Sequence, residues 1–303
     1  MYESSFVEAA GVRLAFMRIG APGPTLVFLH EGLGSIAQWR DFPESLARAT
    51  GFGALVYERQ GHGASDPLAG PRTARYLHDE ALIVLPAVLS ATGIGDAVLI
   101  GHSDGGSIAL IYAGDEVARR DVKLRGVITE AAHVMVEEES LAGIRAAKKA
   151  YATTDLAQRL ARYHGIGIRS GVGQAIRLPG DGAAIAGRQI ACPTSAAKGS
   201  RPSASADDTR ADALFFAWAD AWLLPDFREL CLDEYVRRIT CPILALQGAD
   251  DEYGTPAQLD VIARTASAPV ETVLIPNCRH TPHQQAREET MARMVVFIKG
   301  LPS

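Results

Sequence analysis

Residues 98–106 read Val98-Leu99-Ile100-Gly101-His102-Ser103-Asp104-Gly105-Gly106, and they join an apolar run to a glycine-rich turn. The helix-forming segment Gly106-Ala113 follows directly. A serine on a sharp strand-to-helix turn projects its hydroxyl above the edge of a sheet, and glycines two positions to either side permit the close backbone contacts that the turn requires. The pattern Gly-x-Ser-x-Gly in this context therefore predicts a nucleophilic serine, Ser103, at the end of a strand.

The rest of the chain alternates between short apolar runs and segments of helical spacing. This alternation predicts a doubly wound α/β fold, in which helices cover both faces of a mostly parallel sheet. An antiparallel hairpin is expected over Phe6-Ile19, with its turn near Ala10-Gly11. The other predicted strands are Thr25-Leu29, Ala54-Tyr57, Ala97-Ile100, Gly126-Thr129, Ile243-Leu246 and Thr272-Ile275, and the predicted helices include Ile36-Arg48, Ala74-Leu89, Pro256-Thr265 and Ala286-Lys299.

An insertion interrupts this alternation between the fourth and fifth of those strands. It predicts a helical cap at residues 133–238, inserted into a core made of residues 1–132 and 239–303. Within residues 165–210, Gly, Ala, Ser and Pro make up 25 of the 46 residues and no aromatic residue occurs, so we expect an exposed, flexible loop there. The predicted cap helices are Ser140-Ala152, Leu156-Tyr163 and Ala211-Leu224.

Composition narrows the classes of function. An apolar content of 48% with 21% charged residues indicates a folded chain, and a net charge of -5 argues against a nucleic-acid partner. We find no signal-peptide pattern and no apolar run long enough to span a membrane, so a cytoplasmic protein without membrane contact is expected. The four cysteines, at positions 192, 231, 241 and 278, fit neither a zinc pattern nor a disulfide framework, so they predict reduced thiols.

A serine nucleophile needs a general base, and the base needs a carboxylate to orient it. Both residue types follow later predicted strands, because Asp250 and Asp251 come after Ile243-Leu246 while His280 and His283 come after the last strand. We take His280 as the base and Asp251 as the carboxylate. The alternatives are that Asp250 only caps its loop, and that His283 is the base or a packing residue.

The order Ser103, Asp251, His280 resembles the alpha/beta-hydrolase family, and the resemblance spans nearly the whole chain. In that family the acid usually stands three residues after the glycine of its loop, which favours Asp251 over its neighbour. The resemblance leaves Glu130 open as the acid, because some members take their carboxylate from the preceding strand. The family usually has glycine before the histidine, where this chain has Arg279.

Upstream, the run His30-Glu31-Gly32-Leu33-Gly34 resembles the oxyanion loop of the family. The resemblance implies an oxyanion hole formed by the backbone N–H groups of Gly32 and Asp104. Glu31 stands where the family usually has glycine, and a carboxylate facing the oxyanion would oppose the transition state. Glu31 is therefore expected to turn away, to pair with a cation such as Arg59, or to face a cationic group of the substrate.

Two features predict the character of the substrate pocket. Glu31 and Asp104 would place two carboxylates near the acyl site, which suits an ammonium-bearing substrate such as an aminoacyl ester. Asp104 also has a simpler explanation as an acid at a helix N-terminus, and its run is distantly similar to that of the biphenyl-hydrolase-like branch. Phe215, Trp218 and Trp222 form an aromatic stripe on one helix face, which would pack the cap on the core or roof an apolar pocket.

These features together predict a serine hydrolase that cleaves a small-molecule carboxylic ester through an acyl-enzyme intermediate. The turn Glu58-Ser65 resembles one that supports the oxyanion loop, and its glycine spacing does not match a dinucleotide-binding loop, so no dinucleotide is expected. Acyl transfer on the triad needs no cofactor, and no metal site is predicted. A C–C bond hydrolase and a perhydrolase remain alternatives on the same triad. A non-catalytic ligand-binding protein on a hydrolase scaffold is the alternative of another class, and the sequence predicts no oligomeric state.

Overall fold

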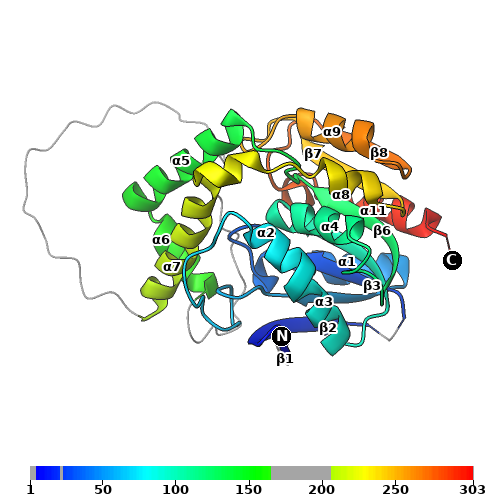
Figure 1. Ribbon diagram of the computed structural model, residues 1–303, viewed down its shortest axis with the longest axis horizontal. Coiled ribbons are helices and arrows are strands. Elements are labelled where there is room, and N and C mark those ends of the chain that lie inside the picture. Colours follow the sequence, from blue (N-terminus) through cyan, green and yellow to red (C-terminus); the bar gives the residue numbers. More distant parts are fainter. Residues whose placement is uncertain (1–4, 21–22, 165–205, 303) are drawn as a thin grey trace, which may run out of the picture.

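The computed structural model describes residues 5–20, 23–164 and 206–302, and an eight-stranded sheet runs through its centre (Figure 1). The strand order is β1-β2-β4-β3-β5-β6-β7-β8, in which the pairs β1–β2 and β2–β4 are antiparallel and the others are parallel. The predicted α/β fold is confirmed. The strands are β1 Ser5–Ala9, β2 Val12–Ile19, β3 Thr25–Leu29, β4 Gly53–Tyr57, β5 Asp96–His102, β6 Lys123–Glu130, β7 Ile243–Gly248 and β8 Val270–Ile275.

The first two strands form the predicted hairpin. Ala10 and Gly11 connect them with φ angles of 52° and 78°, both in the left-handed region. A two-residue turn of this kind matches the right-handed twist of the strands that it joins, and glycine adopts it without a steric penalty.

The sheet is buried on both faces. In β3, Leu26 and Phe28 belong to the hydrophobic core that includes α1 (Phe42–Thr50) and α11 (Arg287–Gly300), whereas the alternate residues belong to the core on the opposite face, with α4 (Asp104–Gly114). Successive side chains of a strand point to opposite faces, so one apolar run supplies both cores. The remaining helices of the α/β core are η1 Ile36–Trp39, α2 Tyr76–Asp79, η2 Glu80–Val84, α3 Leu85–Ala91, α9 Ala257–Thr265 and α10 Pro282–Gln285.

Two helices that the sequence predicts as continuous are interrupted. The segment Ile36-Arg48 breaks at Arg40, whose φ of 53° ends η1, and α1 restarts with Pro43 in its first turn. The segment Ala74-Leu89 contains the π-helical stretch η2 just before Pro86. Proline has no N–H to bond the carbonyl four residues earlier, so a local change of hydrogen-bond pattern accommodates it.

The insertion between β6 and β7 is helical in its described parts: α5 Glu138–Thr153, α6 Leu156–His164, α7 Ala206–Trp222, η3 Pro225–Glu229 and α8 Asp233–Arg238. Helices α5, α6 and α7 pack on one another, at the left of Figure 1, while α8 packs against α4 and α9 and so extends the core layer. The predicted loop at 165–210 ends earlier than expected, because α7 starts at Ala206, and residues 165–205 lie outside the described residues. No helix in the described part of the chain has both the length and the apolar character needed to cross a membrane.

Candidate active site

Ser103 occupies a strained turn between β5 and α4. Its φ of 52° lies in the left-handed region, which a non-glycine residue rarely adopts outside sites of function. A side chain at Gly101 would collide with the backbone of Gly105, and one at Gly105 would collide with the carbonyl of Leu29. The two glycines of the motif are therefore required by close backbone approach, as the sequence predicts.

The loop after β7 brings Asp251 to His280. The imidazole Nδ1–H donates to the carboxylate, with Nδ1 lying 2.8 Å from Oδ1 and 3.0 Å from Oδ2. The carboxylate also accepts bonds from the backbone N–H of Tyr253 at 2.8 Å and from Nε2 of Gln247 at 3.1 Å. Asp250 has an exposed side chain, so the structure pairs the predicted acid, and not its neighbour, with His280.

The other two candidates from the sequence pair with each other. Nδ1–H of His283 donates to Oε2 of Glu130 at 2.8 Å, and both residues are buried. The ring of His102 contacts the histidines of both pairs, since its centroid is 5.2 Å from that of His283 and 5.2 Å from that of His280. Thus the four residues form two separate pairs.

The electrostatics of the first pair favour a charged imidazole. Burial alone lowers the pKa of His280, but the charge and hydrogen bond of Asp251 raise it, and Glu31 and Glu252 add to the rise, so that it reaches about 9. Burial acts to raise the pKa of Asp251, but the charge and hydrogen bond of His280 hold it below its ordinary value. For Glu31, burial raises the pKa, against the opposing charge of His280.

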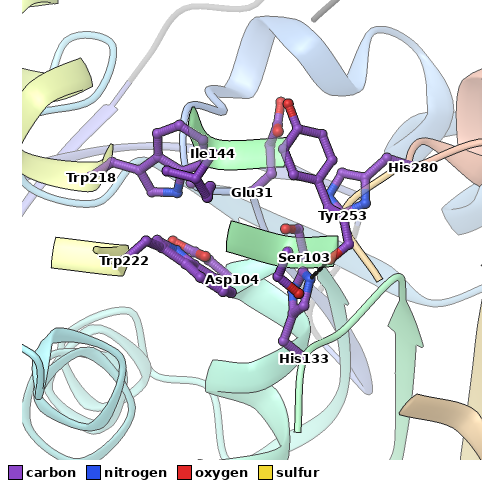
Figure 2. A pocket seen from close by; sticks show the side chains of 11 residues that line it. Glu31, Ser103, Asp104, His133, Ile144, Trp218, Trp222, Tyr253 and His280 are labelled. Atoms are coloured by element: carbon purple, nitrogen blue, oxygen red, sulfur yellow. Dashed lines mark hydrogen bonds between the residues drawn. The ribbon is translucent and has the colours of Figure 1, made fainter. Parts of the chain in front are cut away.

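Ser103 and His280 face one cavity beneath the cap (Figure 2). In the close-up, Trp218 and Trp222 lie on one side of Ser103, and Tyr253 and His280 lie on the other. The cavity has a volume of about 10 Å³, which is room for about one water molecule. Its walls are formed by Glu31, Gly32, Ser103, Asp104, His133, Ser140, Ile144, Trp218, Trp222, Tyr253 and His280.

The cap closes directly on the predicted oxyanion loop. A side chain at Gly32 would overlap the indole of Trp218, so only glycine permits this contact. The carbonyl of Gly32 accepts a bond from Nε2–H of His62 at 3.1 Å, which explains how the turn Glu58-Ser65 supports the loop. Arg59 donates to the backbone carbonyl of Glu31 at 2.6 Å and not to its carboxylate, so the ion pair that the sequence left open does not form. Glu31 lies in the wall of the cavity.

Asp104 has one satisfied and one unsatisfied carboxylate oxygen. Oδ2 accepts a bond from the hydroxyl of Tyr76 at 2.7 Å, whereas Oδ1 is buried without a hydrogen-bond partner. Burial and the charge of Arg59 lower the pKa of the nearby Arg72 guanidinium, and the charge of Asp104 opposes this only in part. No hydrogen bond or ion pair joins the described side chains of Arg72 and Asp104. A buried carboxylate oxygen without a partner, in the wall of the pocket, suits a donor group on a ligand.

One predicted pocket residue is placed elsewhere. Phe215 does not line the cavity, because it stacks on Tyr151 with a centroid distance of 3.8 Å and lies entirely inside the cap. Positions 215, 218 and 222 lie near one another around the helix axis, but only Trp218 and Trp222 reach the cavity. The aromatic stripe therefore splits between cap packing and pocket lining.

The sequence did not indicate four residues of the pocket wall: His133, Ser140, Ile144 and Tyr253. Nε2–H of His133 donates to the carbonyl of Tyr253 at 3.0 Å, and the Tyr253 ring lies 4.7 Å from that of His280. Tyr253 follows the acid by two residues, and His133 follows β6 by three, so position after a strand end was the available signal. Among the described residues, no group of three His, Cys, Asp or Glu side chains is arranged to hold a metal ion.

Comparisons with known proteins agree with this architecture. A family model described as "Alpha/beta hydrolase family" matches residues 26–293. An E-2-(acetamidomethylene)succinate hydrolase is similar in structure, with a TM-score of 0.65 and 20% identity over 99% of this chain and 100% of that one. A thermophilic esterase from Thermogutta terrifontis is similar with a TM-score of 0.63 and 19% identity over 98% of each chain.

Among curated proteins, a sn-1-specific diacylglycerol lipase from Danio rerio is 35% identical over 88 residues, which is 29% of this chain and 26% of the lipase. The chain spans less than a third of the length of the curated relatives that it matches first. Solved structures at such low identity show the fold alone, whereas the family model covers most of the chain. The chain therefore belongs to the alpha/beta hydrolase family.

Proposed function

We propose that this protein is a serine hydrolase that cleaves a small-molecule carboxylic ester through an acyl-enzyme intermediate. The observation that carries the proposal is the meeting of Ser103 with the Asp251–His280 pair at one cavity, from three separate loops. A nucleophile, a base and an orienting carboxylate in this order supply what acyl transfer to serine requires.

The mechanism follows from the positions of the groups. Ser103 Oγ attacks the ester carbonyl while Nε2 of His280 takes its proton, and Asp251 stabilises the imidazolium through Nδ1–H. The backbone N–H groups of Gly32 and Asp104, which the family resemblance assigns to the oxyanion hole, bind the oxyanion, and the imidazolium returns the proton to the leaving alcohol. Water then attacks the acyl-serine with the same imidazole as base.

The size of the cavity limits the substrate. A volume of about 10 Å³ does not hold an acyl group, so the side chains of Trp218, Trp222 and Ile144 must move when a substrate enters. These three residues come from the cap helices α5 and α7, whose displacement would open the cavity without disturbing the sheet. We therefore propose short acyl chains as the preferred substrates.

The acidic wall favours a particular group of esters. Oδ1 of Asp104 is buried without a partner, and the carboxylate of Glu31 lines the same cavity. An α-ammonium group on the acyl side would give Asp104 a charge-assisted hydrogen bond, so α-aminoacyl esters are the second, narrower proposal.

Labelling with a fluorophosphonate tests the general proposal. Wild-type protein should be labelled at Ser103 and should hydrolyse a panel of short-chain esters, and Ser103→Ala should abolish both. Ser107→Ala is the matched control, because Ser107 is a buried serine on α4, four residues after Ser103, and its hydroxyl donates to the carbonyl of His133 at 2.7 Å. Wild-type protein that resists the reagent would refute the serine mechanism and would favour the ligand-binding alternative.

If labelling succeeds but esters are not cleaved, assays with vinylogous diketones and with peracid formation separate the two alternative activities. For the narrower proposal, an α-aminoacyl ester should exceed its des-amino analogue in kcat/KM by about tenfold or more. Asp104→Asn keeps the backbone N–H of the oxyanion hole and should erase only that preference. Equal kcat/KM values for the two esters in the wild type would exclude an ammonium site.

A further inference from the structure

Glu130 contacts both halves of the proposed catalytic machinery. Its backbone carbonyl accepts the N–H of Ser103 at 2.8 Å, and its side-chain Oε2 accepts the backbone N–H of His283 at 3.0 Å and the ring Nδ1–H at 2.8 Å. The residue thus joins the end of β6 to the nucleophile on one side and to the start of α10 on the other. Its side chain is fully buried, so water does not compete for these bonds.

The segment that carries His280 is short and lies immediately before this contact. His283 is three residues further along the chain, so a bond that fixes its backbone N–H also fixes the main chain that holds the catalytic imidazole. A second bond acts from β5, because Nε2–H of His102 donates to the carbonyl of His280 at 2.7 Å. The loop is thus held by β5, which ends just before Ser103, and by the neighbouring strand β6.

The loop lacks the glycine that the family usually has before the histidine. Arg279 occupies that position without a positive φ, and it forms an ion pair with Glu252 at 3.3 Å. Oε1 of Gln285 accepts the backbone N–H of Arg279 at 2.8 Å. The bond from Gln285 is local, whereas the ion pair and a bond from the backbone N–H of Asp250 to the carbonyl of Cys278 at 2.8 Å join the loop to the loop after β7. Glu130 adds the connection to the end of β6.

The second pair does not itself meet the reacting atoms. His283 lines a separate polar cavity of about 20 Å³ together with Trp39 and His102, and it is absent from the wall of the cavity that holds Ser103. The His283 ring packs against Trp39 with a centroid distance of 4.5 Å. A role as an alternative base would require it to reach Ser103 past His102.

We propose that Glu130 and His283 are positioning residues, which clamp the histidine loop to β6 and thereby hold His280 at the distance and angle that proton transfer from Ser103 requires. This inference rests on the proposed serine mechanism. A shift of about 1 Å in a catalytic group reduces the rate by about a hundredfold, so loss of the clamp should lower kcat and leave KM almost unchanged.

The test uses variants that separate the clamp from stability. Removing His283 alone would leave a buried carboxylate unpaired and could prevent folding. The double variant Glu130→Leu/His283→Phe removes both partners and keeps the packing apolar, and His283→Asn retains an N–H donor near the position of Nδ1. Arg125→Met is the control. Arg125 lies on β6 at the end opposite to Glu130, where it pairs with Asp96 of β5.

In the double variant we expect kcat, per mole of folded protein, to fall by about ten- to a hundredfold at nearly constant KM. The single variant His283→Asn should keep most of the wild-type kcat, and Arg125→Met should lower only the free energy of unfolding. The titration of the His280 ring, followed by 15N NMR, should move to lower pH in the double variant alone, since a displaced ring loses part of its contact with Asp251.

A double variant with kcat within twofold of the wild type and an unchanged His280 titration would overturn the clamp. So would a His283→Asn variant as impaired as the double variant, because then the donated bond is not what matters. The NMR readout does not depend on turnover: if wild-type protein fails to react with a fluorophosphonate, the proposed function fails while the titration still decides the positioning role.

Discussion

Two carboxylate–imidazole pairs lie within one region of this molecule, and their hydrogen bonds are nearly identical. Asp251 bonds Nδ1 of His280 at 2.8 Å, and Glu130 bonds Nδ1 of His283 at 2.8 Å. The first faces the cavity that contains Ser103, whereas the second is enclosed by aromatic side chains behind it. Under the proposed mechanism, pairing with a carboxylate does not by itself identify the catalytic imidazole. Access to a nucleophile and to substrate makes the difference.

The test with the largest expected effect compares substitutions of the two histidines. His280→Ala should reduce kcat by about a millionfold, as much as Ser103→Ala, since members of a catalytic triad act as a unit. His283→Asn should cost less than about tenfold, because it keeps the donated bond that we assign to positioning. Steady-state kinetics with a short-chain ester measure both variants. An inactive His283→Asn beside an active His280→Ala would reverse the assignment of the base.

A second test compares substitutions of the two carboxylates. Asp251→Asn should lower kcat by about ten-thousandfold, since the imidazole loses its orientation and the stabilisation of its charge. Glu130→Gln keeps an oxygen acceptor for His283 and should cost about tenfold. Asp250→Asn is the control for the acid loop, because its side chain is exposed, and its kcat should remain within a factor of about two. A larger effect from Glu130→Gln than from Asp251→Asn would reassign the acid.

A third test compares the tryptophan beside each pair. Trp218→Ala opens the wall of the active-site cavity and should raise kcat/KM for a longer acyl chain, relative to acetyl, by about tenfold. Trp39→Ala removes packing from His283 and should lower the free energy of unfolding by about 3–5 kcal/mol without changing the preference for acyl length. Chain-length profiles and denaturant unfolding distinguish the two results. An unchanged chain-length profile in Trp218→Ala would show that the cap does not limit the acyl group.

The smallest effect concerns pH. Since His280 must be neutral to accept a proton and its pKa is raised to about 9, kcat/KM should rise with pH through that region, well above the range of an ordinary histidine. Glu31→Gln removes one of the negative charges that raise this pKa, so the rise should move to lower pH. Glu252→Gln should move it less, because Glu252 is paired with Arg279. A profile that already levels off near pH 6.5 in the wild type would contradict the raised pKa.

The sequence alone determined the elements whose signals are local. The Gly-x-Ser-x-Gly motif after an apolar run predicts the turn at Ser103 from local sequence, and a Cβ at Gly101 would collide with the backbone of Gly105 four residues later. The apolar runs located the parallel strands, because a strand that is buried on both faces must be apolar along its whole length. The family resemblance then supplied the order of nucleophile, acid and base.

Tertiary structure decided what the sequence left open, which is how Glu130 and His283 are used. The family resemblance favoured Asp251 and His280, but only the folded chain shows that Glu130 and His283 pair with each other. The register of neighbouring parallel strands and the path of each loop set distances of a few ångströms, and no local pattern encodes them. The cap shows the same limit: Trp218 meets Gly32 while Phe215 turns to Tyr151, because the docking of α7 on the core selects which part of one helix face reaches the cavity.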